Sequence, residues 1–252
     1  MDKPDAFQGS PWIAEPTEDW NRPPYWCDYY RELLAEADPC RRDRVVHRQV
    51  ELLIRMLSQV GELPRSSPQM LLDAGCGVAL IPHVLAYWGF QVTAIDSCPQ
   101  SIEVAVRQQP TEEKLSRCVP IWDSCPDMPG AYELVEDAAR SLQRLRGFNA
   151  PGGSVSHLSG DWLTANLSAG IFGLVHCRNS LRCSTKSYWR RSLLRFHELL
   201  SPGGVLLLEN VNAIGIQTEV EELLAECGFV SLAAGAFREP VARYVIAMWP
   251  TG

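Results

Sequence analysis

The chain has 252 residues, 46% of them hydrophobic, and a formal net charge of −7 at pH 7. This length and apolar content fit one large domain with a buried core, or one domain with an added segment. The acidic balance disfavours a broad nucleic-acid-binding surface, so we expect no nucleic-acid partner. Nine cysteines are scattered without a C-x-x-C pair, which predicts no zinc or other metal site.

Targeting and membrane-spanning patterns are not found in the sequence. Its N-terminus lacks the basic stretch and apolar run of a secretory signal peptide. No apolar stretch approaches the length of about 18 residues that a membrane helix needs. We therefore expect a cytoplasmic protein without a membrane partner, and the oligomeric state is left open.

The first 65 residues are predicted to form an N-terminal extension. Residues 1–30 are rich in proline and aromatic side chains, and a helix is expected to begin near Trp26 and to end before Pro39. A second helix is predicted over 41–61, where apolar residues recur at helical spacing and Gly61 and Pro64 end the pattern. Residues 66–252 are expected to form the main domain.

From residue 70 onwards, short apolar runs alternate with helical patterns, as in a doubly wound α/β fold with a mostly parallel sheet. The predicted strands are Met70–Asp73, Gln91–Ile95, Val155–Leu158, Ile171–Cys177, Val205–Glu209, Val230–Ala234 and Arg243–Trp249. The predicted helices are Val78–Trp88, Pro99–Gln108, a segment over 184–200 with Ser184 as its N-cap, and Gln217–Cys227. Residues 201–204, Ser-Pro-Gly-Gly, are predicted to form a turn.

A long connection over about 110–153 interrupts this alternation. Connections of this length inside a compact domain are unusual and often functional. We interpret it as an insertion that forms one wall of a substrate site, with these expected contact residues: Trp122, Asp123, Met128 and Tyr132.

The densest signal lies where the first two predicted strands end. The first strand ends in Asp73, a loop Gly75-Cys76-Gly77 follows, and the second strand ends in Asp96. Glycines let the backbone approach a ligand closely, and an acid at a strand tip can accept both hydroxyls of a ribose. The alternative is a βαβ unit whose glycines only serve a tight turn. A dinucleotide fingerprint would need glycine where Leu80 stands, which disfavours a nicotinamide oxidoreductase.

This segment resembles motifs I and II of the class I S-adenosylmethionine-dependent methyltransferases, written [D/E]-x-G-x-G-x-G followed by an acid. Asp73, Gly75 and Gly77 match motif I, and Ala79 replaces its third glycine. Asp96 occupies the position of the family's ribose-binding acid. The resemblance covers about residues 70–250. It implies a seven-stranded Rossmann-like sheet with an antiparallel last strand, S-adenosyl-L-methionine as cofactor and S-adenosyl-L-homocysteine as product.

The resemblance also assigns cofactor contacts. It implies that the loop backbone at Ala74, Gly75, Cys76 and Gly77 cradles the methionine part, with Asp73 near its amino group. Asp96 would bind the ribose, with Ser97 and Cys98 beside the adenine. Asp161 would accept a hydrogen bond from the adenine amino group and Trp162 would cover the adenine face; the alternative for Asp161 is a helix N-cap.

The segment after the fourth predicted strand borders the substrate in this family. His176 lies under the sulfonium by resemblance and is a candidate general base, or else a packed histidine. Arg178 is a candidate catalytic residue and a candidate for binding an anionic substrate group, or else forms a salt bridge to Asp161 or Glu209. Asn179, Glu209 and Asn210 also face the predicted site. Cys177 is disfavoured as a nucleophile, because nothing nearby is expected to lower the pKa of its thiol.

The N-terminal aromatic cluster is the other candidate for a substrate site. Tyr25, Trp26, Tyr29 and Tyr30 would form a stacking or cation–π wall if the segment folds over the cofactor as a lid. The alternative is a structural staple that holds the first helix to the core.

These features favour a methyltransferase that acts on oxygen or nitrogen of a small aromatic, amine or acid metabolite by in-line transfer. The alternatives are a protein or peptide methyltransferase, and an interaction partner that keeps the fold without turnover. RNA methylation is disfavoured by the negative charge.

Overall fold

The computed structural model describes residues 70–77, 81–87, 89–107, 153–178, 180–181, 185–209, 217–237 and 242–250, together with Leu53, Met56 and Val60. Leu53 and Met56 are helical and fully buried, which agrees with the helix expected over 41–61. The rest of the N-terminal extension and the insertion over about 110–153, apart from residue 153, lie outside the described residues. The proposed domain boundaries at residue 65 and at the insertion stay predictions.

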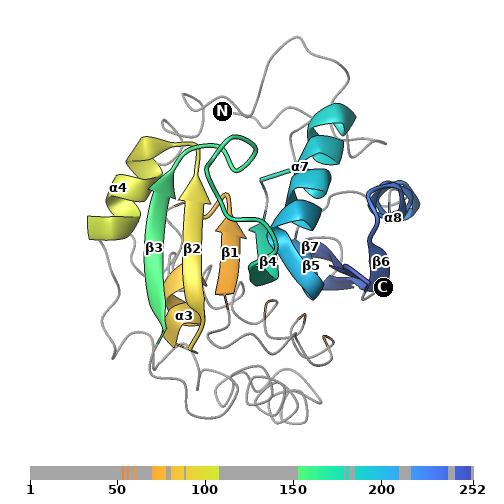
Figure 1. Ribbon diagram of the computed structural model, residues 1–252, viewed down its shortest axis with the longest axis horizontal. Coiled ribbons are helices and arrows are strands. Elements are labelled where there is room, and N and C mark those ends of the chain that lie inside the picture. The colour runs from red at the N-terminus through yellow and green to blue at the C-terminus, as the bar shows by residue number, and fades with distance from the viewer. Residues whose placement is uncertain are drawn as a thin grey trace.

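A seven-stranded sheet forms the centre of the molecule, in the order β3-β2-β1-β4-β5-β7-β6 (Figure 1). Strands β1 to β5 pair in parallel, whereas β7 runs antiparallel to both β5 and β6. The strands are β1 (Met70–Ala74), β2 (Gln91–Asp96), β3 (Ser154–Ser159), β4 (Phe172–Arg178), β5 (Leu200–Glu209), β6 (Val230–Phe237) and β7 (Ala242–Met248). The predicted doubly wound sheet with an antiparallel last strand is confirmed.

Four described helices flank this sheet: α3 (Ile81–Tyr87), α4 (Pro99–Arg107), α7 (Lys186–Leu199) and α8 (Gln217–Glu226). Helices α3 and α4 lie beside β2 and β3, whereas α7 and α8 lie toward β5 and β6 (Figure 1). The chain moves outward from β1 to β3 on one side and then returns to place β4 on the other side of β1. This reversal makes the carboxyl ends of β1 and β4 the switch point where open α/β sheets bind ligands.

The core explains why the central strands read as continuous aliphatic runs. All of β4 except Arg178 is buried, and so are the last six residues of β5, as expected for strands covered on both faces. Leu72, Val175 and Leu206, which are register partners on β1, β4 and β5, join one apolar cluster with the inner side of α7. The buried residues of α7 are Trp189, Ser192, Leu193, Phe196 and Leu199.

The start of α7 differs from the prediction. Thr185, not Ser184, is the N-cap: its backbone is extended and its side chain accepts a hydrogen bond from the Tyr188 backbone N–H at 3.2 Å. Serine and threonine cap helices with similar preference, so the two adjacent residues could not be ranked from their types.

The Ser-Pro-Gly-Gly segment also differs, because it belongs to β5 rather than to a separate turn. Leu200 pairs with Phe172, and the register then shifts before Leu174 pairs with Val205. Gly203 has φ +77°, and its N–H donates to the Trp249 carbonyl at 3.0 Å. The Pro-Gly-Gly residues that suggested a turn instead form an irregularity inside the strand.

Among the described residues, no helix has both the length and the apolar character needed to cross a membrane.

Two adjacent leucines on α7 test this packing. Leu193 is 0% exposed and Leu194 is 49% exposed. Leu193→Ala should lower the free energy of unfolding by about 2–5 kcal/mol, because it leaves a cavity in the core. The matched control Leu194→Ala should change it by less than about 0.5 kcal/mol. Urea denaturation of both variants measures the difference, and equal losses would contradict the assigned faces of α7.

Candidate functional site

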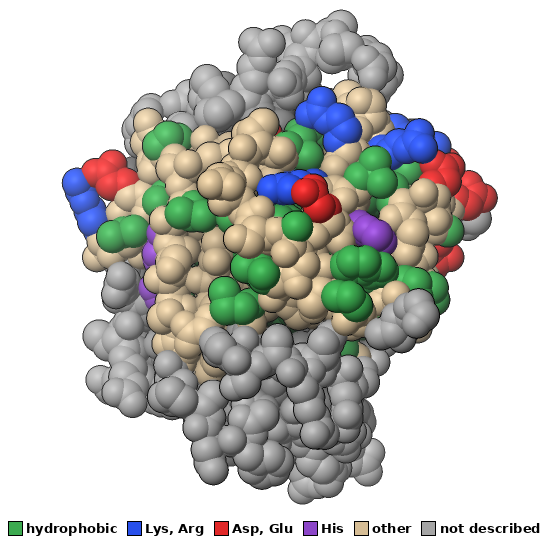
Figure 2. All heavy atoms as spheres, viewed as in Figure 1, with side chains coloured by type: hydrophobic (Ala, Val, Ile, Leu, Met, Phe, Trp, Pro, Cys, Tyr) green, Lys and Arg blue, Asp and Glu red, His purple; other side chains and the backbone are tan. Residues whose placement is uncertain are grey.

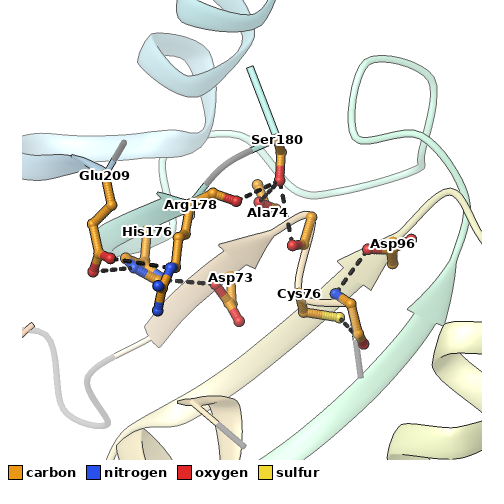
Figure 3. Close-up of polar contacts among 10 residues, drawn as sticks. Asp73, Ala74, Cys76, Asp96, His176, Arg178, Ser180 and Glu209 are labelled. Carbon is orange, nitrogen blue, oxygen red and sulfur yellow. Dashed lines mark hydrogen bonds and ion pairs between the residues drawn. The ribbon is translucent and has the colours of Figure 1, made fainter. Parts of the chain in front are cut away.

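The loop after β1 meets the segment after β4 at the switch point of the sheet (Figure 3). The Ser180 hydroxyl lies 3.3 Å from the carbonyl oxygens of both Ala74 and Gly75, and 2.9 Å from that of Arg178. On the other side, the N–H groups of Gly75 and Cys76 donate to the Ile95 carbonyl at 2.8 and 3.1 Å. The loop is therefore tied to both neighbouring strands.

Gly75 is required by this close approach. A Cβ atom at Gly75 would lie 1.8 Å from the Ser180 hydroxyl oxygen, and its φ of +75° disfavours any L side chain. Gly77 also has a positive φ, at +56°. Both glycines of the motif thus serve a tight turn, and Gly75 also lets the loop backbone approach Ser180, just after β4.

Asp96 anchors the same loop to the tip of β2. Its two carboxylate oxygens accept hydrogen bonds from the N–H groups of Gly77 and Cys98, both at 2.8 Å. Burial raises the pKa of Asp96, and these two N–H donors partly offset that rise. Asp96 is buried, at 8% exposed, and lies at the strand tip where the ribose-binding acid was predicted.

Asp161 caps the turn that follows β3. Its carboxylate accepts from the Leu163 N–H at 2.9 Å, and its carbonyl accepts from the N–H groups of Thr164 and Ala165. The local capping role considered from the sequence is therefore occupied, at a turn rather than at a helix. Nothing in this geometry prevents the other carboxylate oxygen from accepting a hydrogen bond from a ligand.

Trp162 lies inside the apolar core. Its indole is 5% exposed, its N–H donates to the Ser192 hydroxyl at 3.2 Å, and its ring centre lies 5.9 Å from that of Phe196. The ring also lies close to Gly75, at 3.6 Å from the position of a Cβ added there. The indole thus packs α7 against the glycine loop, and little of its face is exposed to an adenine.

Three central strands place acid, histidine and acid side by side (Figure 3). His176 Nδ1 lies 2.6 Å from Asp73 Oδ1, and His176 Nε2 lies 2.9 Å from Glu209 Oε1. Arg178 Nε lies 3.4 Å from Glu209 Oε2, so the predicted alternative of a salt bridge to Glu209 is present. Asp73, His176 and Glu209 are almost fully buried, at 1–3% exposed.

Burial alone would lower the pKa of His176, but the charges and hydrogen bonds of Asp73 and Glu209 outweigh it and raise the pKa to about 10. Burial also raises the pKa of the Cys177 thiol well above its ordinary value, and the negative charge of Asp73 adds to that rise. This agrees with the expectation that Cys177 is no nucleophile.

Ser180 has no motif that would have revealed it from the sequence. It meets the loop only because β1 and β4, about a hundred residues apart, are neighbours in the sheet. Ser97 is half-buried beside Asp96, and Cys98 is fully buried. The other predicted substrate contacts lie outside the described residues: Tyr25, Trp26, Tyr29, Tyr30, Trp122, Asp123, Met128, Tyr132, Asn179 and Asn210.

A family model described as a methyltransferase domain matches residues 42–235. The match spans most of the chain, which therefore belongs to the class I S-adenosylmethionine-dependent methyltransferases, an enzyme family whose cofactor is S-adenosyl-L-methionine. It begins at residue 42, inside the predicted N-terminal extension.

Curated relatives match over shorter stretches. The ubiquinone biosynthesis O-methyltransferase of Bordetella bronchiseptica is 28% identical over 128 residues, which cover 46% of this chain and 52% of the relative. The enzyme of the same name from Chromobacterium violaceum is 37% identical over 68 residues, or 26% of this chain and 29% of the relative. The chain thus matches about half or less of the length of these relatives.

Solved structures share the fold at low sequence identity. The magnesium protoporphyrin IX methyltransferase of Synechocystis PCC 6803 with bound SAM has a TM-score of 0.54 at 15% identity, covering 94% of this chain and 99% of its own. A SAM-dependent methyltransferase of Leishmania major has a TM-score of 0.54 at 13% identity, covering 92% of this chain and 87% of its own. The [4+2]-cyclase SpnF has a TM-score of 0.52 at 15% identity, covering 82% of this chain and 81% of its own. Likeness at this identity concerns the fold alone.

The contact between Gly75 and Ser180 can be tested by a double-mutant cycle. Gly75→Ala should destabilise the protein, because the new methyl group meets Ser180 and the left-handed backbone is strained by about 1–2 kcal/mol. Ser180→Gly removes both clashing atoms, so in the double variant only the backbone strain should remain. Thermal unfolding of the four proteins measures the coupling. Strict additivity would show that the loop does not press on Ser180.

Proposed function

We propose that the chain transfers the methyl group of S-adenosyl-L-methionine to oxygen or nitrogen of a small aromatic, amine or acid molecule. The observation that carries this proposal is the loop from Asp73 to Gly77. It is held against both neighbouring strands at the switch point, with Asp96 at its side.

The described residues fit this cofactor. Carboxylates suit an ammonium group and the two hydroxyls of a ribose, and three acids lie at the ends of neighbouring strands. We assign Asp73 to the amino group, Asp96 to the ribose, and Asp161 to the adenine amino group, with Ser97 beside the adenine. The backbone of Ala74, Gly75, Cys76 and Gly77 would cradle the methionine part, and Trp162 would support the loop from the core side.

S-adenosyl-L-methionine supplies a methyl group on a sulfonium, which a nucleophile attacks in line with the leaving sulfur. The work left to the protein is to align the acceptor and to keep the site dry, and alignment by itself can lower the barrier by several kcal/mol, up to about 7–11. A general base is needed only for an acceptor that must lose its proton during attack. A site without an obvious base among its described residues is compatible with catalysis.

Two observations favour a small-molecule acceptor. The partial relatives are named as O-methyltransferases of ubiquinone biosynthesis, and the net charge of −7 argues against a nucleic-acid acceptor.

Arg178 and Glu209 form an ion pair at the ends of β4 and β5, and the Arg178 side chain is 21% exposed. We place the acceptor on this side of the loop. The aromatic residues near the N-terminus and Asn179 remain the further candidates for its wall.

The first test is calorimetric titration with S-adenosyl-L-homocysteine and, separately, with NADH. Binding of the first at micromolar concentration, equivalent to about −8 kcal/mol, with none of the second is the expected result. Since the fold also occurs in a [4+2]-cyclase, binding is followed by transfer of an isotope-labelled methyl group to a panel of phenols, amines, carboxylic acids and peptides. No binding of S-adenosyl-L-homocysteine overturns the proposal, and labelling of peptides alone would replace the small-molecule acceptor.

Asp96→Ala tests the assigned ribose contact. It should weaken binding of S-adenosyl-L-homocysteine by about 1–3 kcal/mol, because hydrogen bonds to a charged group are lost. The loss combines ligand contacts with the anchoring of Gly77, so Asp96→Asn is measured beside it. The amide keeps one acceptor oxygen and should retain part of the affinity. An unchanged dissociation constant in Asp96→Ala would contradict the assignment.

A further inference from the structure

The row Asp73–His176–Glu209 is the least expected feature of the site. In the sheet, Asp73 is the register partner of His176, and His176 is the register partner of Leu207. Glu209 lies two residues beyond Leu207 and therefore on the same face of the sheet. The three side chains form a continuous row across β1, β4 and β5, with the histidine in the middle (Figure 3).

The hydrogen bonds of this row define the protonation of His176. A neutral imidazole has one N–H donor and one acceptor, whereas an ionised carboxylate only accepts. Both ring nitrogens of His176 lie within hydrogen-bond distance of a carboxylate oxygen, at 2.6 and 2.9 Å. With both acids ionised, both nitrogens must donate, so the ring is an imidazolium.

The charges of the row support the same protonation. With a neutral ring, only the Arg178 guanidinium would compensate the two buried carboxylates, and the one negative charge left over is costly in a protein interior. The imidazolium compensates one and the Arg178 guanidinium, 3.4 Å from Glu209, compensates the other. The pKa of His176, raised to about 10 by the two carboxylates against the effect of burial, agrees with this balance.

The row engages only one of the two carboxylate oxygens of Asp73. Oδ1 of Asp73 is held by His176, and among the described residues no partner engages its Oδ2. A carboxylate that is clamped through one oxygen presents the other in a defined direction. This is the requirement for a residue that receives an ammonium group.

We propose that His176 is a positioning residue, which holds the Asp73 carboxylate ready for the amino group of S-adenosyl-L-methionine and takes no proton from the acceptor. This inference rests on the proposed function. It replaces the general-base role considered for His176 in the sequence: an imidazolium has no lone pair to accept a proton, and the side chain is 1% exposed.

The test compares two ligands that differ only at the amino-acid end. S-adenosyl-L-homocysteine carries the ammonium group, whereas 5′-methylthioadenosine keeps the adenine and ribose without it. His176→Gln should weaken the first by about tenfold or more, as expected when a charged hydrogen-bond network is broken, and leave the second within twofold of the unchanged protein. His157→Gln, on the edge strand β3 away from the row, is the matched control and should alter neither.

The outcomes separate the two proposals. If the unchanged protein does not bind S-adenosyl-L-homocysteine, the proposed function fails. If it binds, but His176→Gln weakens both ligands equally or neither, the positioning role fails. A limb near pH 6.5 in the kcat profile of the unchanged protein that His176→Gln removes would restore the general base. The positioning role predicts no such limb, and a raised KM for S-adenosyl-L-methionine with little change in kcat.

A measurement on the unchanged protein covers the case in which His176→Gln does not fold. Nitrogen-15 NMR of the imidazole should show both ring nitrogens of His176 protonated from pH 6 to 9. A raised pKa in the folded state stabilises the fold fully below about pH 6.5, and this contribution is lost as the pH rises through about 10. Histidine signals that all titrate near 6.5 would overturn the inference.

Discussion

The loop from Asp73 to Gly77 is held from two sides, and the rest of the site depends on that attachment. On one side Asp96 and the Ile95 carbonyl bind its N–H groups, and on the other Ser180 lies against its carbonyls. The approach is so close that only glycine fits at position 75. A loop fixed in this way presents its backbone to a ligand without a further cost of ordering, which is how pre-organised sites gain affinity.

Buried charge in the middle of an aliphatic sheet is a second constraint. Ionised groups in such a place are rarely the most stable choice, since apolar residues of similar size often stabilise a protein as well or better. In the row of Asp73, His176 and Glu209, both ring nitrogens of His176 have a carboxylate partner, and Arg178 pairs with Glu209. A histidine hydrogen-bonded at both ring nitrogens has few alternative arrangements, so it fixes the orientation of the Asp73 carboxylate.

The likeness to known methyltransferases identifies the fold and the cofactor, but not the methyl acceptor. The family match covers most of the chain and carries the cofactor, whereas the structural neighbours share the sheet at 13–15% identity. A sheet of this kind positions a ligand at the carboxyl ends of its strands whatever the reaction. The acceptor therefore depends on the segments that surround this edge.

The alternation of strands and helices was predictable because it rests on local patterns. Continuous aliphatic runs such as Val205–Glu209 and the motif from Asp73 to Asp96 carry their meaning in neighbouring residues. The exact start of α7 was not predictable, because Ser184 and Thr185 are residue types that both cap helices well. The Ser-Pro-Gly-Gly segment was also misjudged, since a glycine with positive φ suits a turn and a strand irregularity alike.

What the residues alone could establish is the class of fold, the loop and the acids at the strand ends. Tertiary structure decided the partners. Arg178 pairs with Glu209, Trp162 packs under the loop, and His176 lies between two carboxylates because β1, β4 and β5 are neighbours in the sheet. These contacts join residues 30 to more than 100 positions apart, and no local pattern encodes them. The protonation of His176, and with it the role of that residue, follows from such contacts and could not be read from the order of the amino acids.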